Sequence, residues 1–165
     1  MGYRCPGNIF LRANDQAMRY IGKDKAESLQ DTQDFINLIT HSLNYSQGIT
    51  WAICLSGTNT LIGYLGFWHI MPEHYRAEIG YMLHPDYWRK NLMSEALTKI
   101  LTYGFKQLNL HSVEANADPE NTSSIRLLEK HGFIREGYFR ENYRVREQFK
   151  DTASYSLLNS GTAYL

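Results

Sequence analysis

The residues between 84 and 96 combine charge, a hydroxyl group and a helix start in the order that phosphate binding requires. The segment HPDYWRKNLMSEA leaves an apolar run and enters a strongly helical pattern. A helix N-terminus offers unpaired backbone N–H groups and the positive end of the helix dipole. Arg89 and Lys90 add two cations there, and Ser94 adds a hydroxyl in the first turn. These groups suit phosphate oxygens, although the cations could equally be solvated loop charges and Ser94 only a helix-start residue.

Signatures of other catalytic chemistries are missing. The histidines His69, His74 and His84 do not have metal-ligand spacing, and the two cysteines, Cys5 and Cys54, lie far apart in the chain. We therefore expect no metal site. The sequence also lacks a G-x-S-x-G nucleophile elbow and a G-x-x-x-x-G-K-[ST] loop.

Composition narrows the class of protein further. The chain has 165 residues, 43% of them hydrophobic, which fits one domain with its own core. Basic and acidic residues number 17 each, and this balance argues against nucleic-acid binding. No apolar stretch is long enough to span a membrane, and the N-terminus lacks the apolar core of a signal peptide. We therefore expect a cytoplasmic protein with reduced cysteines.

Hydrophobic periodicity predicts a single α/β domain over residues 1–165, with a mixed sheet. The expected strands are 49–55, 61–70, 77–83, 112–117, 133–139 and 148–158. The expected helices are 8–21, 28–43, 93–108 and 122–131, with end signals at Gly22, Ser28, Asp31, Asn121 and Gly132. The strand–helix–strand unit at 77–117 implies a parallel pair with a crossover helix. A ligand crevice is expected at the strand ends near that crossover.

Two stretches of the sequence resemble the GNAT acyltransferase family: AEIGYMLHPDYWRKNLMSEAL and VEANADPENTSSIRLLEKHGFIREGYFRE. Within the family they are similar to the RimJ/RimL-type branch, which includes N-terminal acetyltransferases of ribosomal proteins. The resemblance extends over residues 14–158, where KDTASYSLL matches the last strand. It implies a GNAT fold with a V-shaped split in the sheet. It also implies an acetyl-CoA-dependent N-acetyltransferase acting on a primary amine, either a protein N-terminus or a small amine.

The resemblance also implies where acetyl-CoA binds. The family holds it between two parallel strands, which here are 78–83 and 112–117. Met82 and Leu83 would contact the pantetheine through their backbone, and Asn121 would meet it from the other side. The pyrophosphate would lie on the loop that enters the long helix, formed by Arg89, Lys90, Asn91, Leu92, Met93 and Ser94.

Two departures from the family pattern stand out. The family loop W-G-x-G-x-(A or M) reads Trp88-Arg89-Lys90-Asn91-Leu92-Met93 here, so both glycines are replaced. Glycine allows close backbone approach and left-handed angles, and asparagine is the best substitute for the latter. The family's opening strand, of the type E-R-L-x-L-R-P-L, has no match in residues 1–13, so that strand is expected to be missing.

A GNAT-type reaction requires a neutral amine. Neutralising an α-amine at pH 7 costs about 1 kcal/mol, against about 5 kcal/mol for lysine. An N-terminal substrate therefore needs only a modest base, and Glu78 is the candidate because it lies on the strand that lines the acetyl donor. It could also be an ordinary ion-paired strand carboxylate. His69 is a weaker candidate, since one histidine at a strand end is often merely packed or exposed.

The leaving thiolate needs a proton donor, and the resemblance implies Ser124. Many family members use a tyrosine before the G-F pair, which is absent here, whereas the RimL-type branch uses a serine three residues after the asparagine. Ser124 and Asn121 could instead be plain helix-cap residues. Tyr138 and Tyr143 are reserve acids, although both also fit as strand aromatics. A backbone N–H near Met82 or Leu83 would stabilise the oxyanion.

Two alternatives to the enzyme stay open at this point. One is an acyl-CoA-binding protein of the same fold without turnover, suggested by the glycine-free loop. The other is an interaction or structural subunit that uses aromatic surface in a homodimer. The loops expected to shape the acceptor site, 22–34, 71–76 and 140–147, do not identify the acceptor.

Overall fold

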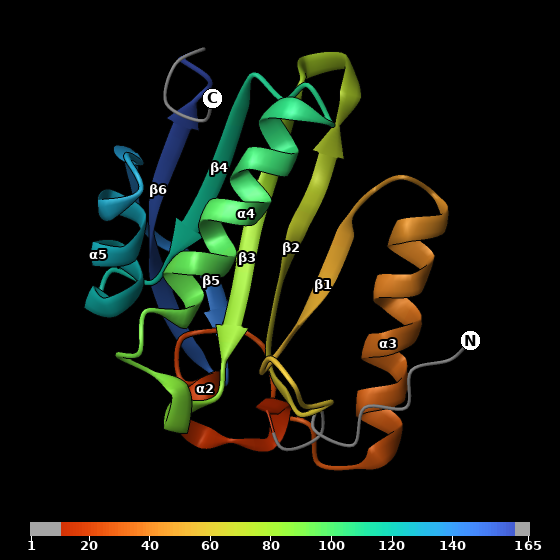
Figure 1. Cartoon of the computed structure of the whole chain (residues 1–165). Helices are drawn as coiled ribbons and strands as arrows, with labels where there is room; N and C mark the ends of the chain where they lie inside the picture. Colours follow the sequence, from red (N-terminus) through yellow and green to blue (C-terminus); the bar gives the residue numbers. More distant parts are fainter. Residues whose placement is uncertain (1–10, 161–165) are drawn as a thin grey trace.

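The computed structural model describes residues 11–160, as a six-stranded sheet with helices on both faces (Figure 1). The helices are α2 (Asp15–Met18), α3 (Leu29–Asn44), α4 (Leu92–Lys106) and α5 (Thr122–Lys130). The strands are β1 (Ile49–Cys54), β2 (Leu61–Met71), β3 (Arg76–Leu83), β4 (Ser112–Ala117), β5 (Ile134–Val145) and β6 (Gln148–Leu158). Among the residues described, no helix is both long and apolar enough to cross a bilayer.

The sheet is mixed, as the sequence predicts. Its strand order is β1-β2-β3-β4-β6-β5, and only the β3–β4 pair is parallel. Helix α4 connects these two strands, which confirms the expected crossover. The parallel pairing is short, because it runs only from Arg76–Ser112 to Glu78–Glu114 in register. Both strands then continue on separate partners, β3 on β2 and β4 on β6.

The main core lies between the sheet and the helices α4 and α5. Alternate residues of the strands face this side, so that Phe67 and Val113 are fully buried with Leu97 and Leu101 of α4. Helix α4 packs close to the sheet at Gly104, where an added Cβ would lie 2.6 Å from the Phe67 ring. The apolar stripe of α4 therefore fixes the helix N-terminus beside the end of β3.

The opposite face of the sheet is covered by α2 and α3. Met18 of α2 packs in a smaller buried cluster with Leu11 and Met82. Phe35 of α3 lies against Tyr64 of β2, with ring centroids 5.3 Å apart. Because side chains alternate along a strand, residues 78, 80 and 82 of β3 face α2 and α3, and the residues between them face α4 and α5.

Several local signals are confirmed. Ser28 and Asp31 form a reciprocal capping box at the start of α3, and the Asn121 side chain caps α5 by accepting a hydrogen bond from the Ser124 N–H at 3.1 Å. Gly22 and Gly132 both have left-handed backbone angles, with φ of +67° and +84°. Glycine adopts these angles without steric cost.

Three expectations need correction. The helix expected over 8–21 is broken, because the Asn14 side chain caps a new four-residue helix, α2; residues 1–10 lie outside the described part of the chain. The loop expected at 71–76 is a short 3₁₀ turn, and β3 already begins at Arg76. The expectation of a loop over 140–147 is also wrong, because β5 extends to Val145. The chain then turns at Arg146 and Glu147, which both have positive φ.

Residues 11–13, at the end of the segment that lacks the family's opening strand, are helical. The rest of that segment lies outside the described residues.

Candidate active site

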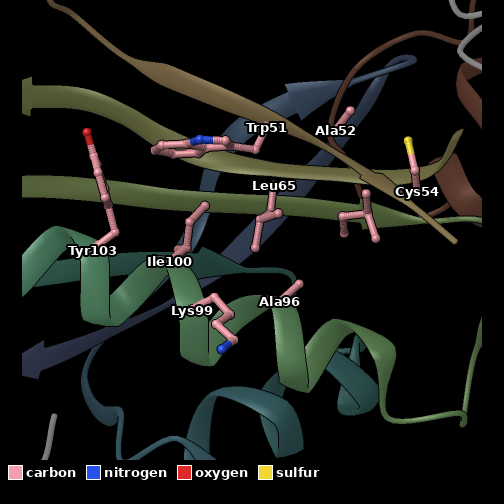
Figure 2. A pocket seen from close by; sticks show the side chains of 9 residues that line it. Trp51, Ala52, Cys54, Leu65, Ala96, Lys99, Ile100 and Tyr103 are labelled. Atoms are coloured by element: carbon pink, nitrogen blue, oxygen red, sulfur yellow. The ribbon is translucent and has the colours of Figure 1, made fainter. Parts of the chain in front are cut away.

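One hollow of about 340 Å³ lies between β1, β2 and α4 (Figure 2). The rings of Trp51 and Tyr103 pack edge-to-face there, with their centroids 5.3 Å apart. Its lining has no carboxylate and no imidazole, and its ionisable groups are Cys54, Lys99 and Tyr103. It offers no base for activating an amine, so we look for the chemistry elsewhere.

The split between β3 and β4 is the feature that the topology makes available to a ligand. In residues 11–160, the side of β3 that faces β4 has no strand partner beyond Glu78, although β3 continues to Leu83. Backbone N–H and C=O groups inside a sheet need partners, so this unpaired stretch can accept an extended ligand. The gap opens toward the N-terminus of α4, which follows β3 in the chain.

The loop from β3 to α4 keeps a glycine-like shape without glycine. Arg89 and Asn91 have φ of +59° and +60°, and these are the two positions where the family pattern has glycine. The Trp88 indole N–H donates to the Leu83 carbonyl at 2.8 Å, which closes the loop. The Asn91 side-chain oxygen accepts from the Lys130 ammonium at 2.8 Å, which ties the loop to α5. The loop is therefore held from both sides.

The side chains at the start of α4 differ in what they can reach. Arg89, Lys90 and Asn91 are exposed, whereas Met93 is buried in the core and can offer a ligand only its backbone. Leu92, half-buried, packs against the same core. Ser94 is buried, and its hydroxyl lies 2.9 Å from His131 Nε2. Burial, and then the charge of Lys130, lowers the pKa of His131.

A hydroxyl pair lies at the other end of α5. The Tyr81 hydroxyl of β3 and the Ser124 Oγ are 2.7 Å apart. Burial raises the pKa of Tyr81 to about 12, against a smaller opposing effect of the bond to Ser124. Tyr81 thus keeps its proton at neutral pH. Sequence reasoning missed it, although strand alternation does put Tyr81 on the same face as Ile79 and Leu83.

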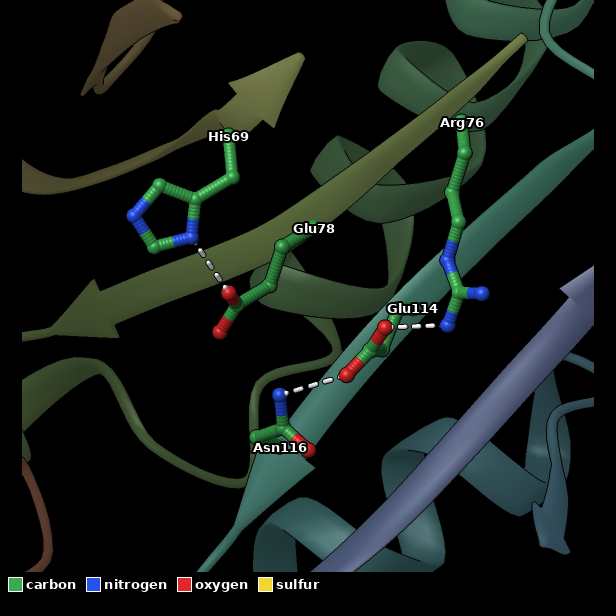
Figure 3. Close-up of polar contacts among 5 residues, drawn as sticks. All are labelled: His69, Arg76, Glu78, Glu114 and Asn116. Atoms are coloured by element: carbon green, nitrogen blue, oxygen red, sulfur yellow. Dashed lines mark hydrogen bonds and ion pairs between the residues drawn. The ribbon is translucent and has the colours of Figure 1, made fainter. Parts of the chain in front are cut away.

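A carboxylate–imidazole pair lies on the opposite face of β3 (Figure 3). Glu78 Oε2 is 2.9 Å from His69 Nδ1, and the two side chains are 29% and 81% exposed. The β2–β3 register shifts between Trp68 and Met71, and His69 has φ of +45°, so a bulge directs the imidazole toward Glu78. Gly80 leaves room for the Trp68 indole, which an added Cβ would meet at 2.8 Å.

A second carboxylate lies beside Glu78 but is already neutralised. Glu114 pairs with Glu78 in register and forms an ion pair with Arg76 (Figure 3). Its other oxygen accepts from the Asn116 side-chain amide at 2.8 Å. Among the described residues Glu78 has no arginine or lysine partner, and its carboxylate is hydrogen-bonded to the His69 imidazole.

The reserve acids lie elsewhere. The Tyr138 hydroxyl donates to Asp151 Oδ2 at 2.5 Å on an exposed surface. Tyr143 lines a different cavity, between α2 and the β5–β6 hairpin. In residues 11–160, no three His, Cys, Asp or Glu side chains form a group that could hold a metal ion.

A ligand that threads the split would meet the exposed cations Arg89 and Lys90 at the start of α4 on one face, and the Glu78–His69 pair on the other. This arrangement is expected of an acyltransferase that uses a CoA thioester. Residues 7–134 match the family described as "Acetyltransferase (GNAT) domain". The chain therefore belongs to the GNAT acetyltransferase family, and it is an N-acetyltransferase.

Similar proteins have the same fold and the same class of activity. The "Uncharacterized N-acetyltransferase YoaA" of Bacillus subtilis (strain 168) is 36% identical over 146 residues, 88% of this chain and 82% of that protein. The spermidine N(1)-acetyltransferase of Vibrio cholerae is 25% identical over 150 residues, 91% of this chain and 84% of that protein. The crystal structure of a GNAT-family acetyltransferase from Bacillus anthracis has a TM-score of 0.80 at 32% identity, covering 92% of this chain and 87% of that one.

Proposed function

We propose that the chain transfers the acetyl group of acetyl-CoA to the α-amine of a peptide or protein by direct attack in a ternary complex. The observation that carries the proposal is the short parallel pairing of β3 and β4, which leaves an unpaired strand edge beside the α4 N-terminus. Such an edge suits the amide groups of pantetheine, and a helix N-terminus suits phosphate. A Vibrio cholerae spermidine N-acetyltransferase, 24% identical to this chain, was crystallised with CoA and spermine, which fits a ternary complex.

The donor would be held by the residues that the sequence resemblance implies. The backbone of Met82 and Leu83 would bind the pantetheine from one side and Asn121 from the other. The pyrophosphate would lie on the backbone N–H groups of Asn91, Leu92 and Met93, with Arg89 and Lys90 adding charge. The left-handed angles of Arg89 and Asn91 support this assignment, because the loop keeps the shape that glycine would give it.

Ser94 has a supporting role in this scheme. Its hydroxyl bonds to His131, so it joins α4 to the end of α5 and contributes to a ligand site through its backbone position at the helix start.

The chemistry divides between the two faces of β3. Glu78, positioned by His69, would accept the proton that the attacking amine loses as the carbon–nitrogen bond forms. A backbone N–H of β3 would stabilise the oxyanion. When the carbon–sulfur bond breaks, the electron pair stays on sulfur. The Ser124 hydroxyl would donate a hydrogen bond to this thiolate, and the Tyr81 hydroxyl would donate one to Ser124. The thiolate then takes a proton from solvent, and Glu78 returns the amine proton to solvent. The high pKa of Tyr81 supports this order, since the phenol stays protonated.

Two experiments test the proposal. Calorimetry should give a micromolar dissociation constant for acetyl-CoA, and thiol release should be measured with peptides that have a free α-amine and with the same peptides N-acetylated. Release that depends on the free amine, with a mass increase of one acetyl group, is the expected result. Binding of acetyl-CoA without release on any amine would contradict the transfer reaction, and no binding at millimolar concentration would contradict the site.

A further inference from the structure

A second cavity, of about 150 Å³, lies between the end of α2 and the β5–β6 hairpin. Its lining includes Met18, Arg19, Lys23, Asp118, Arg146 and Lys150. The Tyr143 ring closes against Gly22, where an added Cβ would lie 3.2 Å from the ring edge. The cavity is therefore built mainly from residues 18–23 and 143–150, with Asp118 from the end of β4.

The cavity lies on the same side of the sheet as Glu78. Met18 of its lining packs on Met82, which shares a face of β3 with Glu78. Asp118 directly follows β4, four residues beyond Glu114, the register partner of Glu78. Four residues of strand extend about 13 Å, at roughly 3.3 Å per residue. Asp118 of the lining is thus about 13 Å along the strand from Glu114, the register partner of the proposed base.

The charge of this lining is strongly asymmetric. It includes four cations, Arg19, Lys23, Arg146 and Lys150, and one carboxylate, Asp118. The side chain of Asp118 is engaged by the local backbone, since Oδ1 accepts from the Glu120 N–H at 2.8 Å. The lining can therefore provide several donors to an anion and only one carboxylate to a cation.

Carboxylates outside the lining offset part of this excess. Asp24 lies 3.6 Å from Arg146, and Glu120 lies 3.8 Å from Lys150, but their side chains are 88% and 71% exposed. Exposed ion pairs of this kind add little stability, so an incoming carboxylate can replace them. Burial, with Asp118 and Asp151, raises the pKa of Tyr143, which leaves its hydroxyl as a further donor.

We infer that the acceptor is a peptide α-amine with carboxylate side chains among its first four residues, held by the Arg19–Lys23–Arg146–Lys150 cluster. The inference rests on the proposed function and names its substrate class. An extended peptide covers 13 Å with about four residues, whereas a free amino acid is too short to reach both sites. A polyamine would bring a second ammonium group against four cations, and like charges at an interface are strongly unfavourable.

Tetrapeptide amides test the preference directly. Ser-Ala-Glu-Glu, Ser-Ala-Gln-Gln and Ser-Ala-Arg-Arg amides differ in charge only at the third and fourth positions, and free glutamate and spermidine serve as short and polycationic acceptors. We expect kcat/KM to be about tenfold or more higher for the Glu peptide than for the Arg peptide. The advantage should shrink as salt is added, because the charges are partly exposed.

Two arginines on the same hairpin give a matched pair of variants. Arg146 lines the cavity, whereas Arg144 pairs with Glu147 at 2.7 Å and does not line it; their side chains are 55% and 54% exposed. Arg146→Glu should remove the preference for the Glu peptide, and Arg144→Glu should keep it. Melting curves of both variants confirm that the hairpin is folded.

The outcomes separate the inference from the proposed function. Faster acetylation of spermidine or of the Arg peptide, or equal effects of the two arginine variants, would overturn the inference and leave the transfer reaction standing. Calorimetry with the Glu peptide in the presence of CoA measures peptide binding separately from acetylation. Binding that Arg146→Glu abolishes, without acetylation, would support the charge preference while the proposed reaction fails. Neither binding nor acetylation of the Glu peptide would overturn the inference.

Discussion

The two faces of the β3–β4 split are built in different ways. The face toward α4 and α5 takes its groups from two short stretches of chain, 81–94 and 121–131, which are joined by the bonds from Lys130 to Asn91 and from His131 to Ser94. The opposite face assembles His69, Glu78 and Glu114 from three strands, and α2 and the β5–β6 hairpin border it. The proposed donor side is thus built from two short stretches of chain, and the proposed acceptor side from residues on separate strands.

This difference indicates which side can change its specificity. In the proposed function, acetyl-CoA binds to the loop that leads into α4. The backbone angles of Arg89 and Asn91 and the bond from Lys130 determine the shape of this loop. Selection among amines is served by side chains at the ends of exposed segments, where single replacements alter charge without disturbing the core. Variants of the loop 88–94 should therefore weaken acetyl-CoA binding, whereas variants of Glu78 and Ser124 should lower kcat.

The largest expected effect comes from Glu78→Gln. If Glu78 is the base, kcat should fall by roughly a hundredfold to ten-thousandfold, the range typical of a lost general base. Acetyl-CoA affinity should be unchanged, because the proposed acetyl-CoA site lies on the face of the sheet toward α4 and α5. Steady-state kinetics and calorimetry measure the two quantities. Glu73→Gln, which removes an exposed carboxylate before β3, is the control. An unchanged kcat would identify Glu78 as an ordinary ion-paired strand residue.

A smaller effect is expected from Ser124→Ala. Loss of a hydrogen bond to a charged sulfur should lower kcat by about tenfold to a hundredfold. Acetyl-CoA affinity should be nearly intact. Tyr81→Phe should act in the same direction and by less, since it removes only the support of Ser124. Collapse of acetyl-CoA binding in Ser124→Ala would instead show a structural residue of α5.

The Tyr81–Ser124 pair also predicts a pH profile. With a pKa of about 12, Tyr81 keeps its proton through the whole neutral and mildly alkaline range. Its deprotonation occurs only as the pH rises toward 12, so it should cause no loss of kcat between pH 7 and pH 10. An alkaline decline within that range, absent from Tyr81→Phe, would show that Tyr81 loses its proton below pH 10 and would contradict its high pKa.

Arg89→Gly should change stability and donor affinity in opposite directions. A non-glycine residue in the left-handed region costs roughly 1–2 kcal/mol, and glycine regains part of this while it adds entropy to the unfolded chain. The net gain in unfolding free energy should be about 0.5–1 kcal/mol. Acetyl-CoA should bind more weakly at low salt because a cation is lost. Arg89→Ala separates the effects, since it loses the charge and keeps the strain. Thermal unfolding and calorimetry measure both.

The elements of the proposed donor side were predictable because the sequence patterns that indicate them lie within short stretches of neighbouring residues. The Asn121 cap, the Gly132 stop and the strand Ser112–Ala117 could all be predicted from neighbouring residues. The family pattern then assigned roles to residues 88–94, and the left-handed angles of Arg89 and Asn91 agree with it. The Tyr81–Ser124 contact was not predictable in this way, because it joins residues 43 positions apart.

The acceptor side was predictable only in part. Glu78 was proposed as the base from its place on the strand, and that role stays a prediction. Its contact with His69 depends on a bulge in β2 that no local residue pattern indicates. The hairpin end was missed because Arg146 and Glu147 lack the Asn-Gly or Asp-Gly signature of such turns, although both adopt left-handed angles. The basic cavity required knowing that α2 packs beside that hairpin.

The smallest expected effect is a pH dependence of stability on the donor side. Burial and the charge of Lys130 lower the pKa of His131, so the folded chain takes up this proton only at a pH below the ordinary value near 6.5. As the pH falls through 6.5, the unfolded chain therefore binds more protons, and the unfolding free energy decreases. His131→Gln can keep a bond to Ser94 without titrating, so its stability should fall less between pH 7 and pH 5. Denaturant unfolding at several pH values measures the slopes, with exposed His111→Gln as the control. Parallel curves for wild type and His131→Gln would show that the link between α4 and α5 does not depend on the neutral imidazole.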